Sequence, residues 1–458
     1  MVFSSITFIF YFLPIALAVY YIVPNKWRNL VLLIESFIFY FFGEPVYVLL
    51  MIFSIITTYV FGILINRYKK YSSIFLILSI CTSIGLLIYF KYTNFIIENI
   101  NLWLANKVDF INVILPIGIS FYTFQMISYI VDVYRGQAKV QKNIFKLATY
   151  VSLFPQLIAG PIVRYVDIES QLENREYTTK KFALGVRRFI IGLGKKVLIA
   201  NVLGELCEVF LASNDKSVLF YWIYAISNML QIYFDFSGYS DMAIGLGKMF
   251  GFEFLENFNY PYIATSITDF WRRWHISLST WFRDYVYIPL GGNRVSKIKW
   301  IRNILVVWLL TGLWHGADWN FIIWGVYFGI LLIIEKLFLE KYLKNIPKIL
   351  SRLYVIVIVI ISFIIFSIGD INKIMQTIGG LVGLGNIPIT SKESIYYFSS
   401  YFVVIIVGII GATPILKNAV NYKKIVNWIE PIFLFIIFVV SISYIIDGSF
   451  NPFLYFRF

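Results

Sequence analysis

The stretch VIVIVIISFIIF, residues 355–366, contains no charged residue, and apolar runs of this kind recur from one end of the chain to the other. Hydrophobic residues make up 59% of the 458 residues, whereas charged residues make up only 14%. A soluble globular protein does not have this composition. A membrane-spanning helix needs roughly 20 mostly apolar residues, while barrel strands show alternating segments of roughly 10. The sequence therefore predicts an all-α, polytopic integral membrane protein.

The net charge of +14 comes from Lys and Arg residues that lie in short loops between the apolar runs. Loops of this kind face the cytoplasm in membrane proteins. Nucleic-acid binders interleave basic residues with an aromatic platform, a pattern that this sequence does not show, so we expect no nucleic-acid partner. The charge predicts a multi-pass protein of the cell (plasma) membrane.

The first apolar run, MVFSSITFIFYFLPIALAVYY, has no charged residue before it, and its basic neighbours Lys26 and Arg28 follow it. It also lacks the small-residue cleavage pattern of a secretory signal peptide. We therefore expect a retained first span with an extracytoplasmic N-terminus.

Two stretches interrupt the pattern of long apolar helices. Pro155 and Pro161, in ATYVSLFPQLIAGPIVR (residues 148–164), predict a broken or re-entrant segment, because proline cannot continue a straight helix. Asp235 and Asp241 interrupt the apolar pattern of YFDFSGYSDMAIGLGKMFGF.

Three ordinary spans are expected near the C-terminus, at Leu353–Ile368, Tyr396–Ile415 and Ile425–Ile446. A Gly-rich outer loop and the basic KNAVNYKK (residues 417–424) separate them. In total we expect about 10–13 membrane segments, by the length of a span, in one membrane-embedded domain, residues 1–458.

Two basic regions flank the most unusual membrane segment. Residues 272–302 hold seven basic side chains against one acidic side chain, and residues 336–352 are basic as well. If both flanks are cytoplasmic, the segment between them must enter the membrane and return. Its apolar halves, Asn303–Trp314 and Trp319–Ile334, are each too short for a comfortable span. We predict a re-entrant pair with His315 at its deep apex; a single tilted helix through His315 is the alternative.

His315 lies in TGLWHGADWN, residues 311–320, and is one of only two histidines in the chain. An ionisable side chain inside a bilayer costs on the order of 3 kcal/mol, which makes it a functional candidate. Gly312 and Gly316 let backbone or a ligand approach closely. We interpret these features as a pocket at His315; a neutral histidine that only joins two helices by a hydrogen bond is the alternative.

The other histidine lies in DFWRRWHISLSTWFRDYVYIPLGGNR, residues 269–294. Apolar and polar side chains here follow spacings of three and four, which predicts an amphipathic helix at the cytoplasmic interface. The apolar face comprises Trp271, Trp274, Leu278 and Trp281, and the polar face comprises Arg272, His275, Ser279 and Arg283. The arginines would form the rim of an entrance for a phosphate-bearing donor, since Arg binds phosphate bidentately. A helix that lies on membrane lipid headgroups is the alternative.

Other reaction types lack the residues that they need. The sequence has no phosphate-binding loop and no nucleophile elbow. Two cysteines, Cys81 and Cys207, and two histidines predict neither a disulfide framework nor a metal site. What remains is a deep His315 able to act as general base for transfer of a group onto a hydroxyl.

Six blocks of sequence, taken in order, resemble the membrane-bound O-acyltransferase family, and most closely its branch with the alginate O-acetyltransferase membrane subunit. The resemblance covers nearly the whole chain. The blocks are LPIGISFYTFQMISYIVDVYRG, LFPQLIAGPIVR, FDFSGYSDMAIGLGKMFGF, NFNYPYIATSITDFWRRWHISLSTWFRDYVYIPLGGNR, GLWHGADWNFIIWG and NPFLYFRF.

This resemblance implies a ring of helices around a thin centre with a tunnel, a donor funnel from the cytoplasm and an acceptor opening outside. The catalytic histidine of the family maps onto His315, and a second polar position maps onto His275. The candidate substrate-binding residues are Arg272, Arg273, Arg283, Trp314 and Asp235.

The implied reaction moves an acetyl group from a cytoplasmic donor, acetyl-CoA or another acyl thioester, to a hydroxyl on the far side, without a bound cofactor. The implied partners are an extracytoplasmic serine-hydrolase-like acetyltransferase and a polysaccharide acceptor. Two alternatives are D-alanyl transfer from a carrier protein to teichoic acid, and a polysaccharide or lipid flippase, which would not need His315.

Overall fold

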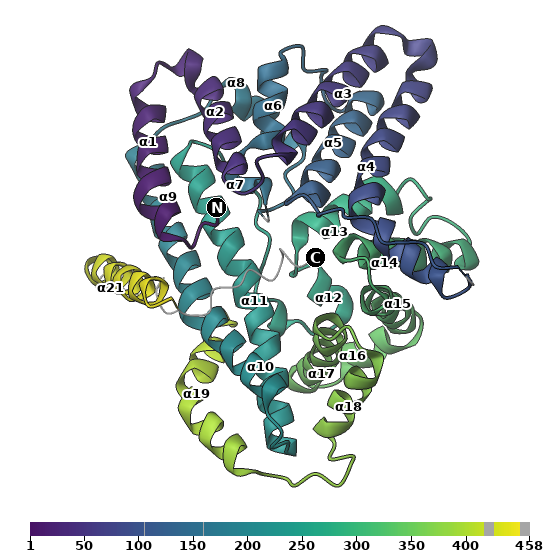
Figure 1. Cartoon of the computed structure of the whole chain (residues 1–458), viewed down its shortest axis with the longest axis vertical. Helices are drawn as coiled ribbons and strands as arrows, with labels where there is room; N and C mark the ends of the chain where they lie inside the picture. The colour runs from purple at the N-terminus through teal and green to yellow at the C-terminus, as the bar shows by residue number, and fades with distance from the viewer. Residues whose placement is uncertain (105, 159, 416–425, 449–458) are drawn as a thin grey trace. The chain divides into compact units, whose positions relative to one another are not determined.

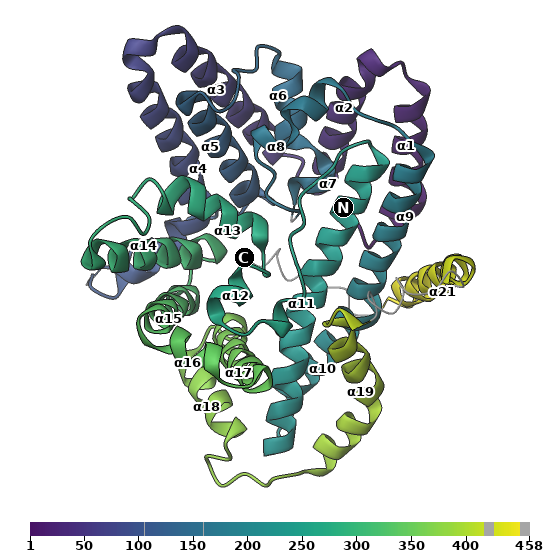
Figure 2. The same cartoon turned by 180° about the vertical axis from the view of Figure 1, so that it is seen from behind.

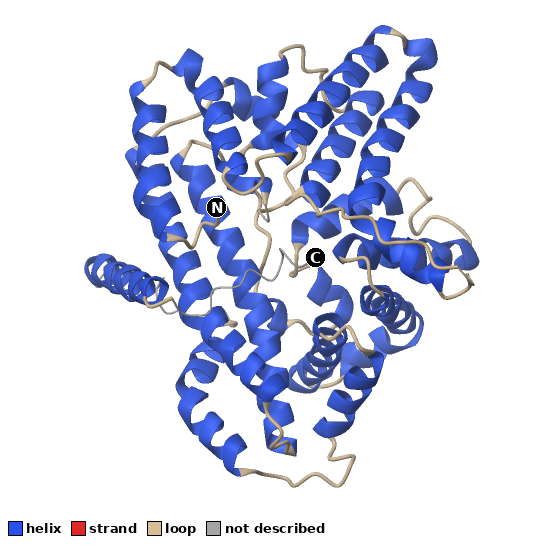
Figure 3. Cartoon of the chain, viewed as in Figure 1, coloured by secondary structure: helices blue, strands red, loops and turns tan. Residues whose placement is uncertain are grey.

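The computed structural model describes residues 1–458 except 105, 159, 416–425 and 449–458. Within this described part the chain forms helices and loops and no strand (Figure 3). The predicted all-α fold is therefore confirmed. The block NPFLYFRF and the basic KNAVNYKK lie outside the described residues.

Six of the described helices are long and apolar enough to cross a membrane, which confirms a polytopic membrane protein. They are Tyr47–Arg67, Lys69–Asn101, Trp319–Asn345, Lys348–Ser367, Lys392–Gly411 and Ile429–Ile446. A shorter apolar helix spans Thr7–Ile22. The larger number of segments expected from the sequence stays a prediction.

The chain divides into two compact units, residues 1–189 with 240–255 and residues 190–239 with 256–458. One membrane-embedded domain for the whole chain stays a prediction. The helices of the first unit are η1 (Thr7–Phe12), α1 (Leu13–Ile22), η2 (Asn25–Trp27), α2 (Arg28–Phe41), α3 (Tyr47–Arg67), η3 (Lys69–Tyr71), α4 (Ser72–Asn101), α5 (Ile119–Arg135), α6 (Ile144–Ser152), α7 (Phe154–Leu157) and α8 (Tyr165–Glu173).

Two long helices pass from one unit into the other, α9 (Thr179–Gly194) and α11 (Val218–Met249). The other helices belong to the second unit. They are η4 (Lys195–Asn201), α10 (Val202–Ala212), η5 (Pro261–Ile263), α12 (Ile267–Trp271), α13 (Ile276–Phe282), η6 (Arg283–Tyr287), α14 (Lys297–His315), α15 (Trp319–Ile334), η7 (Glu335–Leu339), α16 (Glu340–Asn345), α17 (Lys348–Ser367), α18 (Ile371–Leu381), α19 (Lys392–Gly411) and α21 (Val426–Ile446).

In the first unit α3, α4 and α5 run side by side in both views (Figure 1; Figure 2). The predicted break follows them: α6 ends at Ser152, and the separate helix α7 carries Pro155 in its first turn. The Phe154 amide there donates to Ser36 Oγ at 3.1 Å. The broken backbone is thus buried against protein, as irregular backbone inside a membrane protein must be.

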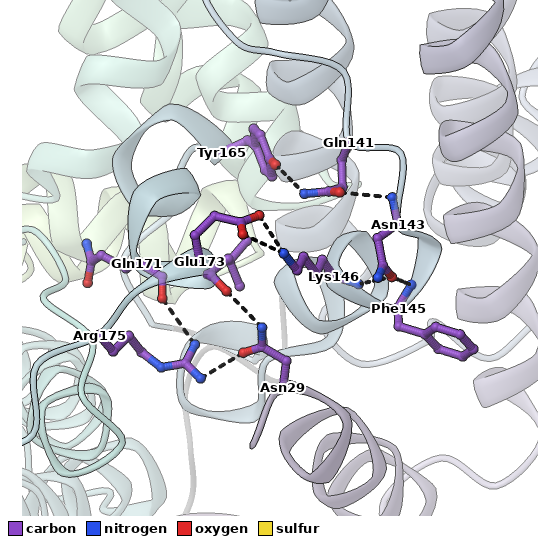
Figure 4. Close-up of polar contacts among 10 residues, drawn as sticks. Asn29, Gln141, Asn143, Phe145, Lys146, Tyr165, Gln171, Glu173 and Arg175 are labelled. Atoms are coloured by element: carbon purple, nitrogen blue, oxygen red, sulfur yellow. Dashed lines mark hydrogen bonds and ion pairs between the residues drawn. The ribbon is translucent and has the colours of Figure 1, made fainter. Parts of the chain in front are cut away.

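A polar network ties the loop ends of the first unit together (Figure 4). Arg175 donates to Asn29 Oδ1 at 2.7 Å and to the Gln171 carbonyl oxygen at 3.2 Å. Lys146, in the first turn of α6, forms an ion pair with Glu173 at 2.6 Å. Side-chain contacts therefore connect the start of α2 and the start of α6 to the chain at the end of α8.

Asp235 and Asp241, which interrupt the apolar pattern of the sequence, do not interrupt a helix. Both lie inside α11, one continuous helix of 32 residues. Each carboxylate has a cationic partner: Asp241 lies 2.7 Å from Arg188, and Asp235 lies 2.6 Å from Lys196. The helix tolerates them because these partners offset the cost of burying a charge.

The segment around His315 is a helical hairpin of α14 and α15, so the alternative of a single helix through His315 is wrong. An added Cβ at Gly312 would lie 2.3 Å from the Phe321 oxygen, and one at Gly325 would lie 2.3 Å from the Trp308 oxygen. Small residues thus let the two backbones approach closely. The second half is longer than expected, because α15 continues through η7 and α16 to Asn345.

The expected Gly-rich outer loop also contains a helix. Between α17 and α19 the chain forms α18, whose N-cap Asp370 accepts hydrogen bonds from the amides of Asn372 and Lys373 at 2.7 and 3.2 Å. This cap satisfies two of the amides that a helix start leaves without a partner.

Candidate active site

His315 is the last residue of α14, and its side chain is enclosed by aromatic rings. It is 4% exposed. Its ring centroid lies 5.0 Å from Trp314, 5.0 Å from Trp324 and 5.2 Å from Phe366. These three rings come from α14, α15 and α17, so the hairpin and one further helix build the enclosure together.

The two glycines beside His315 do not leave an open pocket, contrary to the sequence interpretation. An added Cβ at Gly316 would lie 2.1 Å from the Phe321 ring, and the space beside Gly312 holds the Phe321 backbone. Both glycines therefore serve the close approach of α15 to α14. The sequence could not distinguish this neighbour from a ligand.

The predicted amphipathic helix through His275 is also wrong, because the chain breaks there. The helix α12 ends at Trp271, α13 begins at Ile276, and His275 between them has φ +43°. Its side chain is 0% exposed, whereas Arg272 is exposed, so the two do not share a polar face. The apolar spacing continues on both sides of the break, which explains why periodicity alone predicted one helix.

Backbone pairing with an earlier segment produces this break. The Ile276 amide donates to the Asn257 oxygen at 3.0 Å, and the Asn259 amide donates to the Arg273 oxygen at 2.9 Å. The carboxylate of Glu335, at the start of η7, binds the first residues of α12. Glu335 accepts from the amides of Ile267 and Thr268 at 2.7 and 2.9 Å.

His275 is oriented by a hydrogen bond rather than by rings alone. Its Nδ1 atom lies 3.1 Å from Asn257 Oδ1, and its ring centroid lies 4.6 Å from the Phe236 ring of α11. The same Asn257 oxygen accepts from the amide and the hydroxyl of Ser277, at 3.2 and 2.9 Å. Asn257 is fully buried.

Trp314 joins the two histidines into one cluster. Its ring centroid lies 5.9 Å from that of His275 and 5.0 Å from that of His315. The two imidazoles come from different elements of the second unit. The cluster therefore places two groups able to accept or donate protons within one buried, aromatic surrounding, which makes it a candidate site for general acid–base chemistry.

The predicted donor-binding arginines lie outside this cluster. Arg273 forms an ion pair with Asp269 at 2.8 Å, and Arg283 forms one with Asp284 at 2.7 Å. Arg272 is exposed.

Asp235 forms an ion pair with Lys196, with Oδ1 and Nζ 2.6 Å apart. The next residue of α11, Phe236, is the one that touches His275. Trp314 is therefore the predicted substrate-binding residue that the structure brings to both histidines, and a substrate contact of Asp235 stays a prediction.

Four residues of the cluster were missed by sequence reasoning: Asn257, Phe236, Trp324 and Phe366. Asn257 lies in the quoted block NFNYPY, but nothing local marks it, since it reaches His275 only through the returning backbone. The three aromatic residues look like the many others in this chain, of which 19% is Phe, Trp or Tyr.

Comparison with known proteins identifies the family of this chain. The family model of the membrane-bound O-acyltransferases matches residues 137–375. The chain is 37% identical to the "Probable alginate O-acetylase" of Azotobacter vinelandii, over all of both proteins. It is 44% identical to that of Pseudomonas aeruginosa over 80% of this chain and 72% of the relative. It is also 34% identical to the peptidoglycan O-acetyltransferase of Helicobacter pylori, over 100% of this chain and 98% of the relative. The chain therefore belongs to the membrane-bound O-acyltransferase family, in the branch of the alginate O-acetylases, and is a multi-pass membrane O-acyltransferase.

Proposed function

We propose that this protein O-acetylates an exported or cell-wall polysaccharide, taking the acetyl group from a cytoplasmic thioester, acetyl-CoA or another acyl thioester. One observation carries the proposal: the only two histidines of the chain meet in one buried aromatic cluster around Trp314. The names of the relatives, alginate O-acetylase and peptidoglycan O-acetyltransferase, support acetyl as the group and polysaccharide as the final acceptor.

In the proposed reaction the oxygen of an acceptor hydroxyl attacks the thioester carbonyl carbon. The new C–O ester bond forms, the C–S bond breaks, and the hydroxyl proton passes through an imidazole of the cluster to the leaving thiolate. His315 and His275 are the candidate catalytic residues, and Trp314 would line the reacting groups. The aromatic surrounding supports this chemistry because it excludes water, which would otherwise hydrolyse the thioester.

For the donor, we propose that Arg272, Arg273 and Arg283 contact phosphate groups at a cytoplasmic entrance. Arg272 is exposed, whereas Arg273 and Arg283 would exchange a carboxylate partner for phosphate. Arginine favours phosphate because its planar fork donates two parallel hydrogen bonds. Asp235 remains a candidate substrate-binding residue.

For the acceptor, we propose that the acetyl group crosses the cell membrane through the protein and is received outside. A serine-hydrolase-like acetyltransferase on that side would then modify the polysaccharide. The extracytoplasmic N-terminus belongs to the same proposal, because it sets which basic loops face the donor.

The test is the replacement His315→Ala. Positioned acid–base catalysis contributes roughly 10² to 10⁴-fold, so acetyl ester formation should nearly disappear while the amount of folded protein in the membrane stays unchanged. The measurement is acetyl ester content of the exported polymer, divided by the amount of monodisperse purified protein.

Thr311→Ala is the matched control. Thr311 lies one turn earlier on α14 and is buried, and its hydroxyl donates a hydrogen bond to the Val307 carbonyl oxygen at 2.7 Å. It should keep acetylation near the wild-type level. Acetylation near wild type in a well-folded His315→Ala protein would overturn the proposed catalytic role of His315.

A second candidate, D-alanyl transfer to teichoic acid, rests on similarity to teichoic acid D-alanyltransferases. The teichoic acid D-alanyltransferase of Bacillus subtilis is 33% identical over 51% of this chain and 62% of the relative. Supplying purified protein with acetyl-CoA or with a D-alanyl carrier protein separates the two, since only the true donor loses its acyl group.

A further inference from the structure

Asn257 is a buried side chain of the site for which the reaction scheme above has no use. It is 0% exposed, and its Oδ1 atom accepts three hydrogen bonds, from His275 Nδ1, the Ser277 amide and the Ser277 hydroxyl. Burying a polar group costs free energy unless it is hydrogen-bonded, and these three donors fix the position of the Asn257 oxygen.

The Ser277 amide decides which way the Asn257 side chain faces. A backbone N–H can only donate, so the Asn257 atom 3.2 Å away from it must be the oxygen and not the NH₂ group. The same oxygen then lies 3.1 Å from His275 Nδ1. Two acceptors at that distance would repel, and His275 Nδ1 therefore carries the hydrogen.

We infer that Asn257 is a positioning residue that holds His275 as the Nδ1–H tautomer, so that His275 Nε2 presents its lone pair to the reacting hydroxyl. In the described part of the chain the structure gives Nε2 no hydrogen-bond partner, although the ring is fully buried. A buried acceptor without a partner is uncommon, because it has given up its hydrogen bonds to water.

The backbone of His275 supports the same inference. Its φ of +43° lies in the left-handed region, which is sterically unfavourable for a residue with a Cβ. Such strained residues cluster where a side chain must point in one direction. Here the strain places the ring between Phe236 and Trp314, with Nδ1 on Asn257.

The consequence for the reaction rests on the proposed function. His275 Nε2 would take the proton of the acceptor hydroxyl as its oxygen bonds to the thioester carbon, and would return that proton to the leaving thiolate. Asn257 Oδ1 would keep its bond to Nδ1–H throughout, so the ring could neither rotate nor change tautomer between the two transfers. The inference about the tautomer itself does not depend on the reaction.

The chain offers a direct test because it contains only two histidines. Protein labelled with ¹⁵N in its histidine rings should give two sets of ring signals. The His315→Ala variant should give only the signals of His275, which assigns them. Protonated and unprotonated ring nitrogens have well-separated ¹⁵N shifts, so the spectrum identifies the tautomer. We expect a protonated Nδ1 and an unprotonated Nε2 for His275 in the wild-type protein.

Asn257→Leu removes the acceptor, and Asn257→Asp keeps it. The leucine variant should shift His275 toward the Nε2–H tautomer and lower kcat by about tenfold or more with little change in KM, because a wrong tautomer presents a hydrogen where the lone pair is needed. The aspartate variant should keep the Nδ1–H tautomer. Asn259→Leu is the matched control. Asn259 is exposed, and its backbone amide and carbonyl form its hydrogen bonds with Arg273.

An Nε2–H tautomer in the wild-type protein would overturn the inference, as would an unchanged tautomer in a folded Asn257→Leu protein. The wild-type spectrum decides the question even if the leucine variant does not fold. If Asn257→Leu shifts the tautomer but leaves kcat unchanged, the tautomer assignment stands and the role of His275 in the proposed reaction fails; loss of acyl transfer in His315→Ala tests the proposed function separately.

Discussion

The two histidines of this protein are both buried, but different kinds of structure hold them. His315 ends a regular helix, and three aromatic rings within 5.2 Å enclose it. His275 sits in a helix break with a left-handed backbone, and a hydrogen bond to Asn257 orients it. One site depends on close helix packing, and the other depends on hydrogen bonds between irregular segments.

The difference indicates how each site would fail. Rings can enclose an imidazole only if the α14–α15 hairpin stays tightly closed, which small residues permit. A polar network keeps its geometry only if every buried member has its partners. Changes to packing should therefore disturb the His315 side, and changes to hydrogen bonding should disturb the His275 side.

The largest effect is expected from Gly312→Leu. The added side chain would begin 2.3 Å from the Phe321 carbonyl oxygen, which belongs to the backbone and cannot move aside. Overpacking of this kind costs about 3 kcal/mol or more, so the amount of folded protein recovered after mild heating in detergent should fall sharply. Gly85→Leu, where the added Cβ meets no atom within 4 Å, should be harmless. Equal recovery of the two variants would show that hairpin closure is not what holds the His315 site.

A smaller effect is expected from Glu335→Gln on the His275 side. The carboxylate accepts from the amides of Ile267 and Thr268, and the NH₂ group of glutamine would face one of these donors. Losing a hydrogen bond to a charged group costs about 1.5–3 kcal/mol, measured as a lower midpoint of thermal unfolding in detergent.

Glu340→Gln is the matched control for that change. Glu340 lies on the same continuous helix and pairs with Lys336 and Lys344, both largely exposed. Exposed pairs contribute about 0–1 kcal/mol, so the unfolding midpoint should hardly move. If the Glu340 variant were the less stable of the two, the importance assigned to the buried network would be wrong.

The smallest effect compares His275→Gly with His275→Ala. Both variants lose the imidazole, but glycine accepts φ +43° without the steric cost of a Cβ, so the glycine variant should be more stable by about 1 kcal/mol. At Ser279, inside α13, the alanine variant should instead be more stable than the glycine variant, because alanine favours a helix interior. The midpoints of thermal unfolding of the four variants test the prediction. The same sign at both positions would argue against a strained backbone at His275.

Much of the architecture could be predicted from local sequence. Stretches such as VIVIVIISFIIF suffice for an all-helical membrane protein, since a bilayer accepts helices with satisfied backbone bonds. Pro155 marks a real break, because a missing amide hydrogen acts wherever the chain is placed. Basic residues on both flanks of the segment around His315 indicated a chain that returns, and the chain does reverse between α14 and α15. The placement of both flanks on the cytoplasmic side stays a prediction.

What the sequence by itself determined is therefore the set of properties that each segment carries alone: its hydrophobicity, its charge and its helix breakers. Only the tertiary structure decided which neighbour each segment meets. The spacing around His275 suits a helix, but pairing with Asn257 and Asn259 breaks it. Gly312 allows close approach, but only the fold places Phe321 there and not a ligand. Such contacts join residues distant in sequence, and their energies depend on partners that no local pattern encodes.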